Sequence, residues 1–176
     1  MKDGKEGAAY PPEADKAHDE DEELRRVFVR EAIVHYRGQA IGLESPLRDP
    51  RHAVAFAKRT IQDHAREHFQ AIYLDGRHRP IAHSVVSVGT ATASLVHPRE
   101  VFQLAVLSGA AAVLILHNHP SGDPRPSPED REVVKRLGRA GRLLGIHLVD
   151  SIVWAHRSGR WVSMREEDPS GFDGPA

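Results

Sequence analysis

The centre of the chain, residues 111–130, reads AAVLILHNHPSGDPRPSPED and joins an apolar run to a loop rich in histidine and proline. The run at 111–116 is short, wholly apolar and bounded by turn residues, which is typical of a strand buried on both faces. Ser127-Pro128 is a helix-start signal, and Asp130 supplies an acid three residues after the serine. The stretch therefore predicts a buried strand, a stiff loop and a helix, in that order.

The flanking segments add strands and helices on both sides of this centre. Ahead of it we expect a helix, two strands and a second helix, at 49–65, 69–74, 81–88 and 98–109. After the loop we expect a helix and two strands, at 128–144, 146–154 and 160–164. The first two and the last two expected strands each form a hairpin. Together with the helices between them, these hairpins predict an α/β (α+β) fold, with a mixed β-sheet flanked by helices.

The composition argues against a membrane protein, an exported protein and a metal site built from cysteine. No stretch approaches the roughly 18–20 apolar residues that span a bilayer, so we expect no membrane partner. The N-terminus has no apolar signal core, and we therefore expect a cytoplasmic protein. The chain has no cysteine but twelve histidines, so any metal must be held by His, Asp or Glu.

Charge is divided unevenly along the chain. Residues 1–24 carry three basic and nine acidic side chains, whereas residues 25–164 carry 20 basic and 12 acidic ones. A basic domain suits DNA or an acidic protein as partner, and the alternative is a solvated arginine-rich surface. The polar composition of both ends predicts a disordered acidic arm at 1–23 and a disordered tail at 165–176.

His117 and His119 end the central strand two residues apart, so their side chains are expected on the same side. The prolines that follow hold the loop stiff, which lets it return Asp130 toward the two imidazoles. Two neutral nitrogens and one carboxylate oxygen are a standard three-ligand set for catalytic zinc. Ser127 and Asp130 also form a capping-box pattern, a purely structural reading that is compatible with metal binding.

The spacing His117-x-His119-x7-Ser127-x2-Asp130 matches the JAMM motif of the JAB/MPN+ metalloprotease family, and HNHPSGDPRPS resembles the signature of its RadC branch. Residues 89–102 and the string LLGIHLVDSIVW are similar to RadC sequences as well. The resemblance implies a JAB/MPN domain of cytidine-deaminase-like architecture at 46–164, with 24–45 as an N-terminal extension.

The same resemblance implies a zinc-dependent hydrolase of peptide or isopeptide bonds, with Zn²⁺ held by His117, His119 and Asp130. A carboxylate upstream would be the general base, and we expect Glu67 because it lies where the first helix gives way to the first strand. Glu100 is the rival, although an acid in the first turn of a helix also complements the helix dipole. The hydroxyl of Ser127 would hydrogen-bond the oxyanion.

Two other functions stay open. RadC proteins carry a DNA-repair label, so the alternative is a DNA-repair or mobile-element-associated protein that acts on or binds DNA through its basic domain. A non-catalytic scaffold is the third hypothesis, and the intact ligand set argues against it. We expect a protein or peptide substrate, and the sequence identifies neither that substrate nor the oligomeric state.

Overall fold

The computed structural model describes residues 46, 47, 49–89 and 96–172. The predicted acidic arm at 1–23 and the extension at 24–45 lie outside the described residues. Along the chain the elements are α1 Pro50–Thr60, β1 Glu67–Leu74, β2 Pro80–Gly89, α2 Pro98–Ser108, β3 Ala112–Asn118, α3 Pro128–Leu144, β4 His147–Ala155, β5 Arg160–Ser163, α4 Met164–Glu167 and the 3-10 helix η1 Pro169–Gly171.

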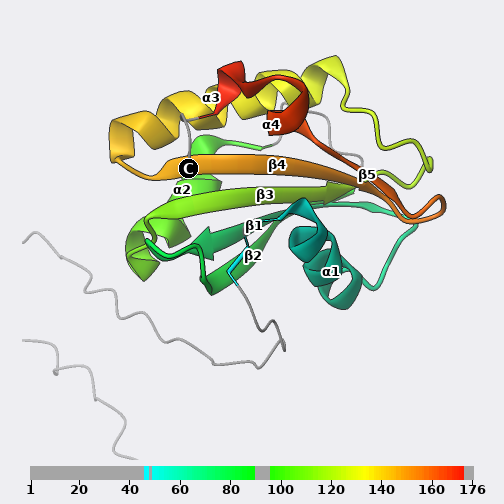
Figure 1. Cartoon of the computed structure of the whole chain (residues 1–176), viewed down its shortest axis with the longest axis horizontal. Coiled ribbons are helices and arrows are strands. Elements are labelled where there is room, and N and C mark those ends of the chain that lie inside the picture. The colour runs from blue at the N-terminus through cyan, green and yellow to red at the C-terminus, as the bar shows by residue number, and fades with distance from the viewer. Residues whose placement is uncertain (1–45, 48, 90–95, 173–176) are drawn as a thin grey trace, which may run out of the picture. The chain divides into compact units, whose positions relative to one another are not determined.

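The described strands form one mixed sheet in the order β2-β1-β3-β4-β5 (Figure 1). β3 is the middle strand, antiparallel to β1 and parallel to β4. The parallel pairing follows because α3 carries the chain back to the start of the sheet before β4 begins. β2 and β5 pair antiparallel with β1 and β4 and form the two edges. The predicted fold class, a mixed sheet flanked by helices, is confirmed.

Two apolar clusters, one on each face of the sheet, hold the helices in place. Alternate residues of β3 divide between them: Val113 and Ile115 pack with α2 and α3, while Leu114 and Leu116 pack with α1. All seven residues of β3 are buried, as its apolar sequence predicts. None of the described helices is long and apolar enough to cross a membrane.

Helix α1 is shorter than predicted, because the expected helix runs to Ala65 and the structure ends it at Thr60. It starts as expected, with the side chain of Asp49 accepting a hydrogen bond from the backbone of Arg51. Ile61 is extended, and beyond it the carboxylate of Asp63 accepts from the N–H of Ala65, which makes a turn in place of a further helical turn.

The predicted disordered tail at 165–176 is wrong for residues 165–172, which form α4 and η1. Phe172 is 7% exposed and packs into the cluster beneath α3, a contact that local composition does not reveal. Buried Asp150 ties α4 to β4, because its carboxylate accepts from the hydroxyl of Ser163 and the N–H of Arg165. The ordered domain therefore extends beyond residue 164.

Packing of η1 on α3 depends on Gly138, and this gives the first prediction. A Cβ at Gly138 would run into the carbonyl oxygen of Gly171. We expect Gly138→Ala to lower the free energy of unfolding by about 1–3 kcal/mol in urea denaturation, the usual cost of overpacking. Arg139→Ala, at the exposed next position, is the control. A gain of about 1 kcal/mol for Gly138→Ala, from helix propensity alone, would contradict this packing.

Candidate metal centre

His117, in β3, and His119, just after the end of that strand, face each other. Their Nε2 atoms are 3.2 Å apart. His117 is 1% exposed and lies beside Phe69 of β1, whose ring stacks on the imidazole at 5.7 Å. His119 has left the strand, but its N–H still donates to the carbonyl of Trp154 in β4. The sheet therefore fixes the backbone of both residues.

Asp130 approaches the histidines from the first turn of α3. One carboxylate oxygen, Oδ1, lies 3.3 Å from Nε2 of His117, and the other, Oδ2, lies 3.6 Å from Nε2 of His119. Ser127 holds that carboxylate by donating to Oδ2 from both its N–H and its hydroxyl, each at 2.7 Å. In return the N–H of Asp130 donates to the Ser127 hydroxyl oxygen, which completes the capping box. Capping and convergence on the histidines occur together.

Glu67 completes the cluster from the first residue of β1. Its Oε1 lies 3.7 Å from Nε2 of His119. In the described part of the chain, Glu67, His117, His119 and Asp130 form the group whose ligand atoms all lie within 4.8 Å of one another. Glu100 is not in this group, because its carboxylate accepts from the N–H of His97 in the capping box of α2. Of the two bases considered, the structure brings Glu67 to the histidines.

The spacing of the donor atoms is close to that found around a tetrahedral metal ion. Ligands at about 2.0–2.1 Å from a tetrahedral zinc ion are separated from one another by about 3.3–3.4 Å. The two Nε2 atoms are 3.2 Å apart, Oδ1 of Asp130 lies 3.3 Å from that of His117, and Oδ2 lies 3.6 Å from that of His119. Nitrogen and carboxylate oxygen are also the donor types that zinc accepts. These residues therefore fit a small divalent cation.

The hydrogen bond made by Nδ1 of His119 fixes which ring nitrogen faces the cluster. Nδ1 of His119 lies 2.9 Å from the carbonyl oxygen of Asp123, and only a protonated nitrogen can donate to that oxygen. Nε2 of the neutral ring then keeps a free lone pair, as a metal ligand must. The contact is made by the backbone carbonyl of Asp123, so the side-chain type at this position does not determine it. The carboxylate of Asp123 instead pairs with Arg125.

Electrostatics keep the Asp130 carboxylate charged. Burial raises its pKa, but hydrogen bonds from His117 and His119 in their protonated forms outweigh burial and hold the pKa well below its usual value. The pKa of His119 is shifted in the opposite direction. Burial lowers this pKa, but Asp130 and the carbonyl of Asp123 raise it above its usual value. The carboxylate is thus available as an anionic ligand at neutral pH.

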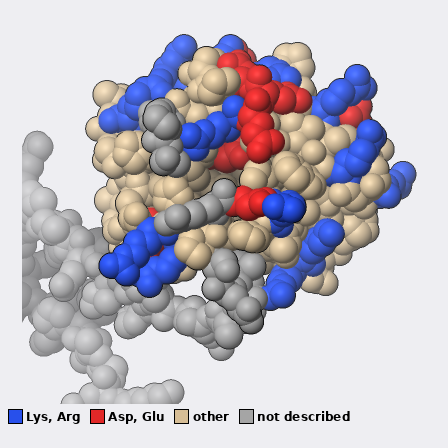
Figure 2. All heavy atoms as spheres, in the orientation of Figure 1, with Lys and Arg blue, Asp and Glu red and all other residues tan. Residues whose placement is uncertain are grey.

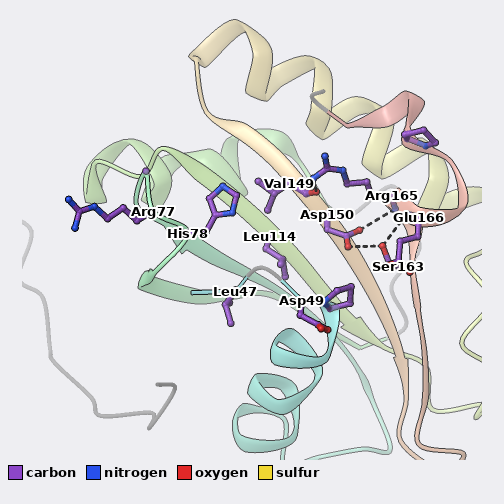
Figure 3. Close-up of a pocket in the computed structure, with 13 residues that line it drawn as sticks. Leu47, Asp49, Arg77, His78, Leu114, Val149, Asp150, Ser163, Arg165 and Glu166 are labelled. Atoms are coloured by element: carbon purple, nitrogen blue, oxygen red, sulfur yellow. Dashed lines mark hydrogen bonds between the residues drawn. The ribbon is translucent and has the colours of Figure 1, made fainter. Parts of the chain in front are cut away.

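Several other polar and aromatic side chains lie outside this cluster. His97 caps α2, with its Nδ1 accepting from the N–H of Arg99. Trp154 is buried against α1, and Trp161 packs at the edge of that cluster. Asp150 lines a cavity of about 700 Å³ at the opposite end of the sheet, between the β1–β2 turn and α4. Figure 3 shows its hydrogen bonds to Ser163 and the Arg165 backbone there.

Comparison with known proteins finds similar sequences over the part of the chain that contains this cluster. Residues 47–169 match the family described as RadC-like JAB domain. A UPF0758 protein of Shouchella clausii is 44% identical over 117 residues, which are 66% of this chain and 50% of the relative. A UPF0758 protein of Methanosarcina acetivorans is 41% identical over 128 residues, 71% of this chain and 55% of the relative. The chain spans about half the length of the curated relatives it matches.

Metal content of the purified protein tests the cluster directly. We expect about one zinc per chain, and we expect His119→Ala to lose it because a ligand nitrogen is removed. Asp130→Asn should bind zinc more weakly, since a neutral amide is a poorer ligand than a carboxylate. His97→Ala, which removes a histidine outside the cluster, is the matched control. A metal-free protein that folds equally well, or zinc lost equally from His97→Ala, would contradict the assignment.

Proposed function

Because this chain belongs to the RadC-like JAB domain family, we propose that it is a zinc-dependent hydrolase of the JAMM type that cleaves peptide or isopeptide bonds. The observation that carries the proposal is the convergence of Glu67, His117, His119 and Asp130. A capping box accounts for Asp130 alone, whereas metal chemistry accounts for all four side chains. Zinc bound to His117, His119 and Asp130 would polarise a carbonyl and lower the pKa of a water molecule toward about 7.

Glu67 has the position of a general base. Its carboxylate is partly exposed and faces the two histidines from a neighbouring strand, with Oε1 3.7 Å from Nε2 of His119. A carboxylate there accepts a proton from the attacking water and returns it to the departing amine. Both transfers require a group within hydrogen-bond reach of the reacting atoms, which the position beside His119 provides.

Ser127 serves two purposes in this proposal. Its hydroxyl donates to Asp130, and its backbone N–H donates to the same carboxylate oxygen. If the hydroxyl turns toward an oxyanion, the N–H still holds Asp130 in place. The hydroxyl can thus stabilise the charge that develops on the attacked carbonyl without releasing a metal ligand.

The roles of the two carboxylates predict opposite effects of removing charge. Glu67→Gln keeps the size of the side chain but cannot accept the proton, so it should retain zinc and stability while turnover falls about 10²–10⁴-fold. Turnover is measured by mass spectrometry on a pooled library of peptides and lysine-linked isopeptides. Glu100→Gln is the matched control and should stay active. An active Glu67→Gln beside an inactive, zinc-loaded Glu100→Gln would assign the base to Glu100.

DNA binding is the second candidate, and the basic composition of the domain favours it. Residues 25–164 carry 20 Lys and Arg against 12 Asp and Glu. Figure 2 shows one face, on which basic residues lie around the margin and acidic residues gather near the top of the view, where Figure 1 places α4. Lysine and arginine contacts to phosphates would bind DNA without reading its sequence.

Affinity for a DNA duplex measured at several salt concentrations tests this second candidate. Binding through phosphates predicts that the logarithm of the affinity falls steeply and linearly with the logarithm of the salt concentration. The zinc site is not required for such contacts, so His119→Ala should bind DNA as the unmodified protein does. Absence of detectable binding at low salt would eliminate the DNA hypothesis and leave the hydrolase proposal unaffected.

A further inference from the structure

Asn118 lies between the two histidines, is 1% exposed, and uses its side chain to hold a neighbouring strand. The Oδ1 atom accepts from the N–H of His68 at 2.8 Å, and the Nδ2 group donates to the carbonyl of Arg66 at 2.9 Å. These two backbone groups flank Glu67. We infer that Asn118 is a positioning residue, whose amide fixes the backbone on both sides of Glu67 and thereby holds its carboxylate at the metal centre.

The amide of Asn118 takes the place of a peptide group at the end of the sheet. The backbone pairing of β1 with β3 ends at Phe69 and His117. Asn118, the next and last residue of β3, still pairs with Trp154 of β4, but the ladder between β1 and β3 does not include Glu67 or His68. The side chain supplies one acceptor and one donor there, as the next residue of a strand would. β1 begins at Glu67, two residues earlier than the predicted Phe69, because Glu67 and His68 still pair with β2, and the Asn118 amide bonds this same stretch from the β3 side.

Only one orientation of the amide satisfies both bonds. A backbone N–H can only donate and a backbone carbonyl can only accept, so Oδ1 must face His68 and Nδ2 must face Arg66. An aspartate would keep the first bond but place a carboxylate oxygen against the carbonyl of Arg66. An alanine would leave both backbone groups without this partner. Asparagine is therefore the residue type that suits this position.

Fixing the strand start determines where the Glu67 side chain points. Glu67 and Phe69 lie on the same face of β1, and the Phe69 ring stacks on His117. Within the sheet, Glu67 pairs with Gly89 of β2, and the Asn118 amide bonds the backbone around Glu67 from the side of β3. These contacts direct the carboxylate toward the histidines, where Oε1 lies 3.7 Å from Nε2 of His119. Strand β3, which carries His117, thus also sets the position of the proposed base through Asn118.

The activity measurement for this inference rests on the proposed hydrolysis. A double-mutant test distinguishes positioning of Glu67 by Asn118 from a general effect of Asn118 on the stability of the fold. Asn118→Ala should reduce turnover of the peptide and isopeptide library about 10–100-fold, the usual effect of removing a supporting hydrogen-bond partner, with zinc content unchanged. In a Glu67→Gln background, Asn118→Ala should cause no further loss, because it acts through Glu67. An additive loss, or loss of zinc together with activity, would overturn the positioning role.

Gln70→Ala is the matched control. Gln70 is also a buried amide, in β1, but it accepts from the hydroxyl of Thr60 and does not contact the groups that flank Glu67. It should lower stability without the specific loss of turnover. Asn118→Asp, which keeps the bond from His68 and loses the bond to Arg66, serves as the second variant if Asn118→Ala does not fold. Full activity of a folded Asn118→Asp would also overturn the inference.

Two NMR readouts on the zinc-loaded protein do not depend on hydrolysis. In Asn118→Ala the His68 amide should exchange with solvent about tenfold faster, since it loses its acceptor. The ¹³C resonance of the Glu67 carboxyl should shift as the group leaves the centre, and both signals should be unchanged in Gln70→Ala. If the unmodified protein cleaves nothing and these changes occur, the positioning role stands while the proposed hydrolysis fails. An unchanged His68 amide in Asn118→Ala would contradict the positioning role itself.

Discussion

Strand β3 is buried along its whole length and hydrogen-bonded to β1 on one side and β4 on the other, and the geometry of the site depends on this double pairing. Because side chains alternate along a strand, a shift of one residue would turn His117 to the opposite face. The division of Val113, Leu114, Ile115 and Leu116 between two clusters makes such a shift costly, since it would exchange the two cores. The apolar run thus positions the histidines that follow it.

The start of α3 shows how one set of bonds can serve both folding and chemistry. A capping box stabilises a helix start by roughly 1 kcal/mol, because it satisfies backbone N–H groups that have no partner in the helix. Here the same bonds fix the carboxylate of Asp130 toward the histidines. The cap thus orders this carboxylate as part of folding, so a metal ion that bound there would not have to order it. In the same way the carbonyl of Asp123 orients His119 through a turn that the loop already makes.

Patterns in neighbouring residues were sufficient to predict that His117, His119 and Asp130 lie together. Strand alternation placed His117 and His119 together, and helix capping placed Asp130 at the start of α3, because both patterns depend on residues close in sequence. The features missed by the sequence depend on contacts between distant segments. Phe172 packs beneath α3 although its neighbours are polar. The Asn118 amide bonds the backbone on both sides of Glu67 across about fifty residues of sequence, which no pattern within β1 could indicate.

A crystal structure of the zinc-loaded protein, with an anomalous difference map at the zinc edge, measures most directly whether these side chains form a zinc site. The geometry predicts one peak per chain about 2.0–2.1 Å from Nε2 of His117, Nε2 of His119 and an oxygen of Asp130. The Glu67 carboxylate should lie beside the ion without ligating it. A peak that involves other residues, or no peak in a protein that binds zinc in solution, would contradict the assignment.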